Sequence, residues 1–352
     1  MQQPSNVCPV TYLRQTPQLL VPLLACCLLW AMPVQKVHAA VVCTATMTDV
    51  NFGSVDLVAG VGLTSSGTLN YTCTNDATTA TNVRVCFNIG DGNESLGFFN
   101  PRRMKSGANI LQFQIFHTSG SIIWGSTGNG TVPLPFTANF SIPRRSGGVN
   151  GSVSGSTTMT GQVLNGQGAA PVGNYQDFFS AAGGHTSISW SDGGTAPTNC
   201  TGTTNGNFQF TVKAAVIKSC TVSAGATSDI QIGPASGVPV DAVNSSGTNS
   251  IGVTCSGGTA YFIGLKPSNN NTAGLGAMSG TGANTDKVPY QLRSVSASGP
   301  IWGNTATATS VGNGVAGIGT GVAQSVPVFA VAPSANFTPD NYSDIVTVIV
   351  NY

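Results

Sequence analysis

The chain carries one set of sequence landmarks twice, and this repeat limits the possible folds more than any other feature of the sequence. Residues 113–125 read FQIFHTSGSIIWG and residues 290–303 read YQLRSVSASGPIWG, so an aromatic–Gln pair precedes a Trp–Gly pair in each half. Upstream, Met104 and Met278 occupy equivalent places, and downstream the segment PVGNYQDFF is matched by TPDNYSDIV. A chain of 352 residues has room for two domains of ordinary size. The repeat therefore predicts two copies of one domain.

The second copy ends earlier than the first. After its Asn-Tyr segment the first copy continues through FQFTVKAAVI at 208–217, whereas the second copy ends at Tyr352. Every second residue of 208–217 is apolar, which is typical of a strand with one buried face, and the members of that face are Phe208, Phe210, Val212, Ala214 and Val216. We expect this strand to complete a first domain, residues 40–217, and to have no counterpart in a second domain, residues 218–352.

The composition favours short strands joined by turns. The chain contains 45 Gly, only 7% of its residues are charged, and no long stretch has a sustained helical period of apolar residues. Segments such as VRVCFNI at 83–89 and DIVTVIVNY at 344–352 are rich in β-branched and aromatic residues. The fold class that follows is all-β, with two antiparallel sandwiches in tandem.

The N-terminal segment has the features of a signal peptide. An apolar run at 19–32 is followed by Val37-His38-Ala39, whose small residues suit cleavage before Ala40. The run is shorter than the roughly 20 residues that a membrane helix needs. Without the two basic residues of this leader, the net charge of +1 becomes −1, which argues against nucleic acid as a partner. Residues 1–39 are thus predicted to direct export.

The cysteines that remain after the leader are even in number, as expected for disulfides in an exported protein. Six cysteines allow 15 pairings, and equivalent positions in the two repeats favour one set. The favoured pairs are Cys43–Cys73, Cys220–Cys255 and, by elimination, Cys86–Cys200.

These landmarks together resemble the spore coat protein U domains, the pilin-like units of archaic chaperone–usher pili. The resemblance rests on the early Cys pair, Arg103-Met104 with Gly107, the aromatic residue before Trp-Gly, the Asn-Tyr-x-Asp segment and the terminal strand ending at Tyr352. The second copy departs from the pattern with Ala277 before its Met. The resemblance covers nearly all of the chain after the leader.

The resemblance implies an incomplete immunoglobulin-like, pilin-type sandwich that receives its missing strand from a neighbouring subunit. Only three residues separate the predicted cleavage site from Cys43, and a donor strand needs roughly ten. We therefore expect a subunit that accepts a strand and donates none, as a tip adhesin does. The implied partners are a periplasmic chaperone, an outer-membrane usher and the next pilus subunit, and the implied place is the pilus tip at the cell surface.

The function that follows from this resemblance is attachment to abiotic or host surfaces and biofilm formation. Long segments of the first copy hold apolar residues among Gly, Ser, Thr and Asn, and they are either exposed fingers or inward-facing strand positions: Phe98, Phe99, Leu134, Phe136, Phe140, Ile142, Val163 and Leu164. A glycan-binding tip and a coat or shaft subunit without a binding role are the alternatives. The basic cluster Arg102, Arg103 and Lys105 either grips an anionic ligand or is a solvated face.

The sequence offers no support for an enzyme. Outside the leader there are two histidines, His117 and His185, and neither has a second His or Cys at metal-ligand spacing. No Gly-x-Ser-x-Gly motif is present, and the Gly-rich runs lack the Lys of a phosphate-binding loop. We therefore expect no catalytic residues, metal or cofactor.

Overall fold

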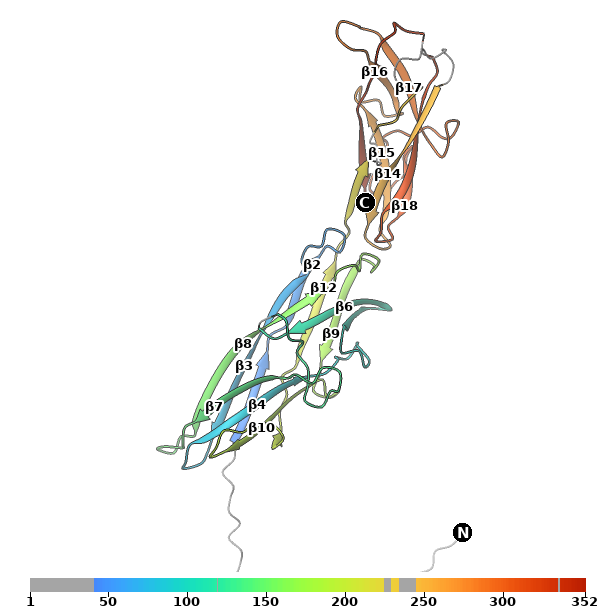
Figure 1. Cartoon of the computed structure of the whole chain (residues 1–352). Helices are drawn as coiled ribbons and strands as arrows, with labels where there is room; N and C mark the ends of the chain where they lie inside the picture. Colours follow the sequence, from blue (N-terminus) through green and yellow to red (C-terminus); the bar gives the residue numbers. More distant parts are fainter. Residues whose placement is uncertain (1–40, 119, 225–228, 234–244, 335) are drawn as a thin grey trace, which may run out of the picture. The chain divides into compact units, whose positions relative to one another are not determined.

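The computed structural model describes residues 41–118, 120–224, 229–233, 245–334 and 336–352, and all regular structure within these ranges is β-strand. The predicted signal peptide lies outside the described residues. The strands form two sandwiches, each with its own hydrophobic core (Figure 1). The chain is therefore all-β, as its composition predicts.

The first sandwich consists of an eight-stranded and a four-stranded sheet. The larger sheet has the order β1-β3-β8-β6-β5-β9-β12-β2 and the smaller one the order β11-β10-β4-β7. Its strands are β1 (Val41–Met47), β2 (Val50–Val55), β3 (Thr64–Asn75), β4 (Thr81–Ile89), β5 (Arg102–Ser106), β6 (Asn109–Phe116), β7 (Phe136–Ile142), β8 (Gly151–Val163), β9 (Gly173–Phe179), β10 (Thr186–Gly193), β11 (Thr203–Thr204) and β12 (Phe210–Val216).

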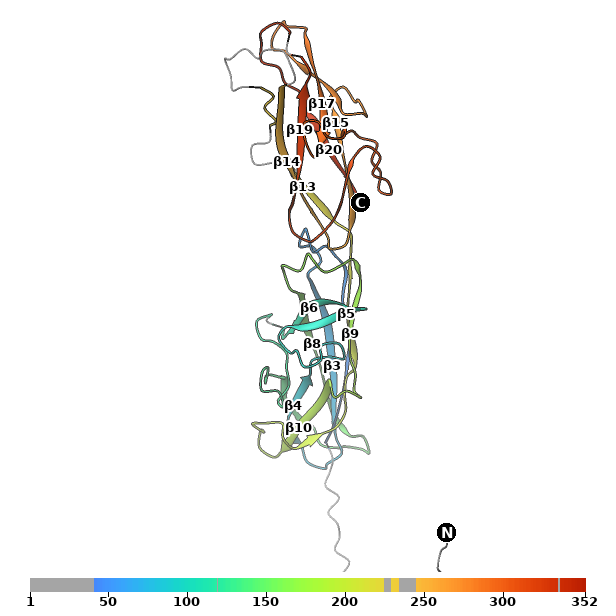
Figure 2. The same ribbon diagram turned by 90° about the vertical axis from the view of Figure 1, so that its right-hand side faces the viewer.

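The second sandwich repeats this plan with fewer strands. A five-stranded sheet has the order β13-β14-β19-β17-β16, and a three-stranded sheet has the order β18-β15-β20 (Figure 2). The strands are β13 (Cys220–Ala224), β14 (Ser245–Cys255), β15 (Ala260–Pro267), β16 (Leu275–Ser279), β17 (Lys287–Ser294), β18 (Val315–Ile318), β19 (Gln324–Ala332) and β20 (Val346–Asn351).

The repeated Trp–Gly pair performs the same packing task in both sandwiches. The indole N–H of Trp124 donates to the carbonyl of Phe87 at 2.8 Å, and that of Trp302 donates to Ile263 at 2.8 Å. Both rings are fully buried, so each indole needs this polar partner. The glycine that follows is required because a Cβ on Gly125 would lie 1.8 Å from the carbonyl oxygen of Val132. The motif thus anchors one sheet to the other.

The repeated Asn-Tyr segment is also structural. The hydroxyl of Tyr175 donates to the carbonyl of Pro171 at 2.7 Å, and that of Tyr342 donates to Thr338 at 2.7 Å, four residues upstream in each case. Each tyrosine therefore fixes the turn that leads into its own segment.

The structure contains the three disulfides that the sequence favoured. Cys43 pairs with Cys73 directly across β1 and β3, and Cys220 pairs with Cys255 across β13 and β14. In the loop-entropy model a bridge that closes about 30 residues stabilises the fold by roughly 3 to 4 kcal/mol. The third bridge, Cys86–Cys200, joins β4 to the loop after β10 and belongs to the first sandwich.

Replacement of Gly125 by Ala should lower the free energy of unfolding by about 1–3 kcal/mol, because the new methyl group overlaps the Val132 carbonyl. Gly128→Ala is the matched control, since a Cβ at this position would have nothing within 4 Å, and it should change stability by less than about 0.5 kcal/mol. Denaturant unfolding of the full chain measures both. Equal stability of the two variants would contradict this account of the Trp–Gly pair.

Candidate functional site

The completing strand of the first sandwich occupies an interior sheet position. β12 is antiparallel to β9 on one side and parallel to β2 on the other, with Val212 opposite both Asp177 and Val50 (Figure 1). Its backbone groups therefore pair on both sides. The strand is a central part of the sheet rather than an edge.

The inward face of β12 closes the core. The five predicted residues of this face are all at least 96% buried. Phe208 and Phe210 stack on Trp124 with ring centroids 5.7 and 6.3 Å apart, and Phe210 stacks on Phe179 at 4.5 Å. Aromatic stacking of this kind adds to the stabilisation from burial. Loss of this strand would expose the centre of the core.

An acidic residue beside β2 holds the outer face of the same strand. Asp49 accepts a hydrogen bond from the backbone N–H of Thr211 at 2.9 Å and forms an ion pair with Lys213 at 2.8 Å. The hydrogen bond from Lys213 lowers the pKa of Asp49. The pair is largely exposed, so it contributes to the position of the strand more than to stability.

The second sandwich contains the neighbours of such a strand without the strand itself. Residues 49–53 read DVNFG and residues 229–233 read DIQIG, so the segment beside β12 in the first sandwich has a counterpart. Ser343 forms a single bridge with Ser279, in the place of the bridge between Gln176 and Lys105. In the described part of the second sandwich, no strand pairs with both residues 229–233 and the segment that contains Ser343.

The apolar residues that flank this strand position in the second sandwich are less buried than the equivalent residues of the first sandwich. We call Ile230, Ile232, Met278 and Val346 the acceptor row; all four are partly buried and pack at the margin of the second core. The equivalent residues of the first sandwich are at least 93% buried, and they are Val50, Phe52, Met104 and Phe179. The residues of the first sandwich are more buried because the side chains of β12 pack against them.

None of the four residues of the acceptor row was among the site residues predicted from the sequence. The predicted site residues describe the strand that is present in the first sandwich, whereas the residues facing the uncovered position include Ile230 and Ile232. The match of DVNFG with DIQIG was the available signal. It is short and lies before the more conspicuous landmarks.

The structure separates the predicted apolar loop residues into three groups. Phe98 and Leu134 are exposed, at 44% and 54%. Phe99, Phe136, Phe140 and Leu164 are partly buried, and the rings of Phe136 and Phe140 pack against Phe87 and Tyr71. Ile142 and Val163 are strand residues with no exposed surface, so the expectation that they form exposed fingers is wrong. Leu96, in the same loop as Phe98, is 73% exposed.

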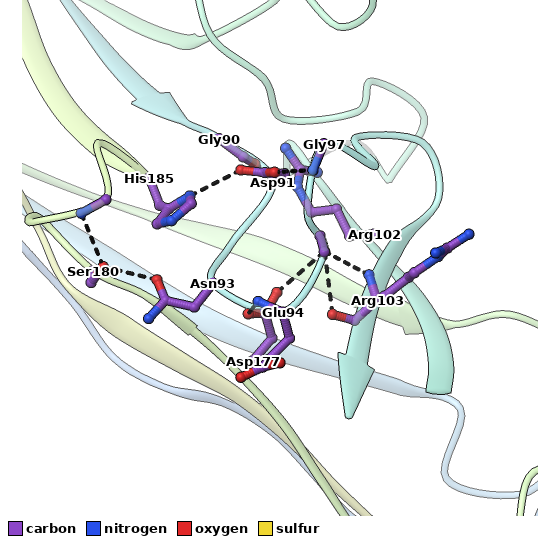
Figure 3. Close-up of polar contacts among 12 residues, drawn as sticks. Gly90, Asp91, Asn93, Glu94, Gly97, Arg102, Arg103, Asp177, Ser180 and His185 are labelled. Atoms are coloured by element: carbon purple, nitrogen blue, oxygen red, sulfur yellow. Dashed lines mark hydrogen bonds and ion pairs between the residues drawn. The ribbon is translucent and has the colours of Figure 1, made fainter. Parts of the chain in front are cut away.

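A buried polar network holds the loop that carries Leu96 and Phe98 (Figure 3). Asp177 accepts hydrogen bonds from the backbone N–H of Glu94 at 2.9 Å and from the Ser95 hydroxyl at 3.4 Å. A Cβ on Gly92 would lie 2.0 Å from the Asp177 carboxylate, so the loop can approach this group only through glycine. Burial raises the pKa of Asp177 to about 7.

Arg102 anchors the start of β5 from within the core. Its guanidinium is fully buried and donates to the carbonyls of Gly90 and Trp124, each at 2.7 Å, and to the Gln114 side chain. Burial lowers the pKa of Arg102 to about 9, so the group is charged at neutral pH. Its donors are satisfied internally, which makes Arg102 unavailable to a ligand.

The rest of the basic cluster is engaged as well. The Arg103 guanidinium lies 3.2 Å from the centroid of the Phe98 ring, and Lys105 forms an ion pair with Glu94 at 3.1 Å. Both contacts are to the loop that follows β4. The cluster therefore supports this loop, whereas the sequence had left open an anion-binding role or a solvated face.

Each of the two histidines bonds to a group on a nearby loop. His185 contacts Asp91 at 2.9 Å, while His117 contacts the carbonyl of Leu134 at 3.3 Å and has its pKa lowered by burial. Across the described ranges, no three His, Cys, Asp or Glu side chains are grouped as a metal site would require. The same ranges hold no helix long and apolar enough to cross a membrane.

A family model described as the spore coat protein U domain matches the chain twice, at residues 30–182 and 206–349. No curated protein matches the sequence. The solved structures similar to this chain include the CsuC–CsuE chaperone–tip adhesion subunit complex of Acinetobacter baumannii, with 16% identity, a TM-score of 0.49 and coverage of 88% of this chain and 100% of that one.

Two further solved structures have lower similarity. CfaE, the adhesive subunit of CFA/I fimbria of enterotoxigenic Escherichia coli, has 9% identity and a TM-score of 0.31, with 87% of this chain and 92% of that one covered. The CupB6 tip adhesin from Pseudomonas aeruginosa has 10% identity and a TM-score of 0.30, with 88% and 93% covered. Likeness at this level carries no information on function.

Asp177→Asn should remove a pH dependence of stability. The folded chain keeps the proton of Asp177 to a higher pH than the unfolded chain, so the free energy of unfolding of the natural protein falls as pH rises from about 4 to about 7. Part of that fall, on the order of 1–3 kcal/mol, should be absent in the variant. Denaturant unfolding of the full chain between pH 4 and 8 measures it, with the exposed Asp192→Asn as control. A slope unchanged in Asp177→Asn would refute the assignment.

Proposed function

This chain belongs to the spore coat protein U domain family, and we propose that it is an adhesive pilus subunit whose second sandwich accepts a strand from another polypeptide. The observation that supports this most directly is the uncovered acceptor row at the position that β12 occupies in the first sandwich. One fold thus occurs twice in one chain, and only its first copy has this strand among the residues that the structure describes.

An uncovered position of this kind favours strand addition for two reasons. Backbone N–H and C=O groups beside a vacant strand position have no partner in the sheet. Partly exposed apolar side chains contribute about 25 cal/mol for each Å² that a partner removes from water. A single added strand provides both the backbone partners and the apolar cover.

The first sandwich shows what chemistry the added strand should have. It should carry apolar side chains at every second position, as β12 does, with aromatic residues at the end that faces Trp302, the counterpart of Trp124. It should run parallel to residues 229–233 and antiparallel to residues 342–346, as β12 runs relative to β2 and β9. A periplasmic chaperone would occupy the position first, and the next pilus subunit would replace it at the usher.

Attachment is assigned to the first sandwich, which is already complete. Leu96, Phe98 and Leu134 are exposed apolar residues on loops of this unit, and exposed apolar groups are suited to contact with hydrophobic surfaces. The loop with Leu96 and Phe98 is fixed by hydrogen bonds with Asp177 and Arg102 and by the contact of Arg103 with the Phe98 ring. A rigid loop loses less conformational entropy when it binds, which favours biofilm attachment by this surface over a purely structural role.

Strand acceptance can be tested by supplying the second sandwich with its own strand. Residues 191–217, with Cys200→Ser, are appended after Tyr352, because Tyr352 and Trp190 occupy equivalent strand positions. The extension should raise the free energy of unfolding of the second sandwich by an amount on the order of 5 kcal/mol. It should also reduce binding of a hydrophobic dye, and it should block incorporation into pili.

The control carries the same extension with Phe210→Asp and Val212→Asp in the appended copy, which removes the apolar face and keeps the length. Thermal unfolding, dye binding and pilus assembly are measured for both proteins. If the two extensions behave alike, the second sandwich does not accept a strand by this mechanism.

The adhesive role is tested by Phe98→Ser with Leu134→Ser. The double variant should retain assembly and show a severalfold loss of attachment to polystyrene, because two apolar contact groups are removed. Val322→Ser, at a 65% exposed apolar residue of the second sandwich, is the matched control and should attach normally. Adhesion of pilus-bearing cells is counted in flow. Full attachment by the double variant would exclude these loops as the contact surface.

A further inference from the structure

A polar cleft lies on the outer face of the four-stranded sheet of the first sandwich. Its volume is about 560 Å³, and its polar lining includes Asn82, Arg84, Asn139, Ser141 and Thr198. Asn82 and Arg84 come from β4, and Asn139 and Ser141 come from the adjacent strand β7. The lining also includes the apolar residues Val83, Phe140 and Pro197.

One wall of the cleft is a loop fixed by covalent and polar contacts. The disulfide Cys86–Cys200 ties the loop 194–202 to β4. Asn82 donates to the carbonyl of Gly194 at 2.9 Å, and the N–H of Gly202 donates to the Ser191 hydroxyl at 3.0 Å. The wall is therefore preformed, as ligand sites usually are.

Arg84 supplies the positive charge of this cleft. Its Nη1 donates to the Asn139 carbonyl oxygen at 3.2 Å, and its Nε is buried with no hydrogen-bond partner among the described residues. Nowhere in the described part of the chain does a carboxylate form an ion pair with Arg84. A guanidinium with one amide partner and no carboxylate partner has further N–H donors for a ligand carboxylate.

We propose that this cleft binds a carboxylated sugar. The guanidinium of Arg84 receives the carboxylate, and the amides of Asn82 and Asn139 with the hydroxyls of Ser141 and Thr198 bond the ring hydroxyls, since amides and hydroxyls both donate and accept. The volume is in the range of small-molecule sites and is far larger than an inorganic anion needs. Pro197 adds an apolar surface for the face of a sugar ring.

The second sandwich lacks the key residues of this site. The acceptors of the two indole N–H groups, Phe87 and Ile263, align β4 with β15, which places Ala260 at the position of Arg84 and Phe262 at that of Cys86. The cation and the disulfide that fixes the wall are thus both confined to the first sandwich. This distribution fits a ligand site and does not fit a requirement of the shared fold.

The test is calorimetric titration of the purified full chain with trigalacturonate and with a hyaluronan tetrasaccharide, which represent two sources of uronic acid. The neutral probes are the methyl ester of trigalacturonate and fully N-acetylated chitotetraose. We expect binding of at least one acidic probe and about tenfold weaker binding of its neutral match, since a charge-assisted hydrogen bond is lost. Absence of binding by both acidic probes at millimolar concentration would overturn the proposal.

Two variants with different chemistry test the role of Arg84. Arg84→Gln removes the positive charge. Asn139→Asp places a carboxylate of the protein beside Arg84, which would then compete with the ligand carboxylate for the guanidinium. Each substitution should weaken binding about tenfold or more. Arg145→Gln, at an exposed basic residue outside the cleft, should bind as the natural protein does. Unchanged binding by a folded Arg84→Gln or Asn139→Asp variant would overturn the assignment. Soluble sugar binding needs no pilus, so its outcome is independent of strand acceptance.

Discussion

An interior position in a β-sheet has to be filled, and this requirement governs both halves of the molecule. In the first sandwich β12 pairs with strands on each side and covers the aromatic centre of the core. The same strand satisfies the backbone groups on both sides and covers the apolar side chains of the core. In the second sandwich the flanking segments are present, and the acceptor row is only partly covered. Within the described residues, the two copies of one fold thus differ by one strand at this position.

The two sandwiches share the features that build the fold and differ in those that can meet a ligand. The Trp–Gly pair and the tyrosine turn occur in both with the same hydrogen bonds. The repeated aspartate differs: Asp177 binds the loop after β4, whereas Asp344 accepts a hydrogen bond from the Tyr290 hydroxyl at 2.6 Å. The loop network, the third disulfide and the polar cleft belong to the first sandwich. The features that are not shared by the two copies are therefore concentrated in the first sandwich.

The apolar loops and the polar network beneath them form one arrangement. Burying a guanidinium and a carboxylate is costly unless each is hydrogen-bonded, and Arg102 and Asp177 each have several partners. These hydrogen bonds offset the cost and fix the loop that carries Leu96 and Phe98. The Arg103 guanidinium lies over one face of the Phe98 ring, which remains 44% exposed.

The sequence by itself determined the features that depend on local pattern and on repetition. Alternating apolar residues predicted β12, and the matched cysteines indicated the bridges, because strand period and repeat register can be read along the chain. Tertiary structure alone decided which apolar residues are exposed, placing Ile142 and Val163 in the core and Phe98 and Leu134 at the surface. It also decided that Arg102 is buried while Arg84 lines a cleft. A side chain's surroundings depend on strands and loops distant in sequence, and no local pattern records them.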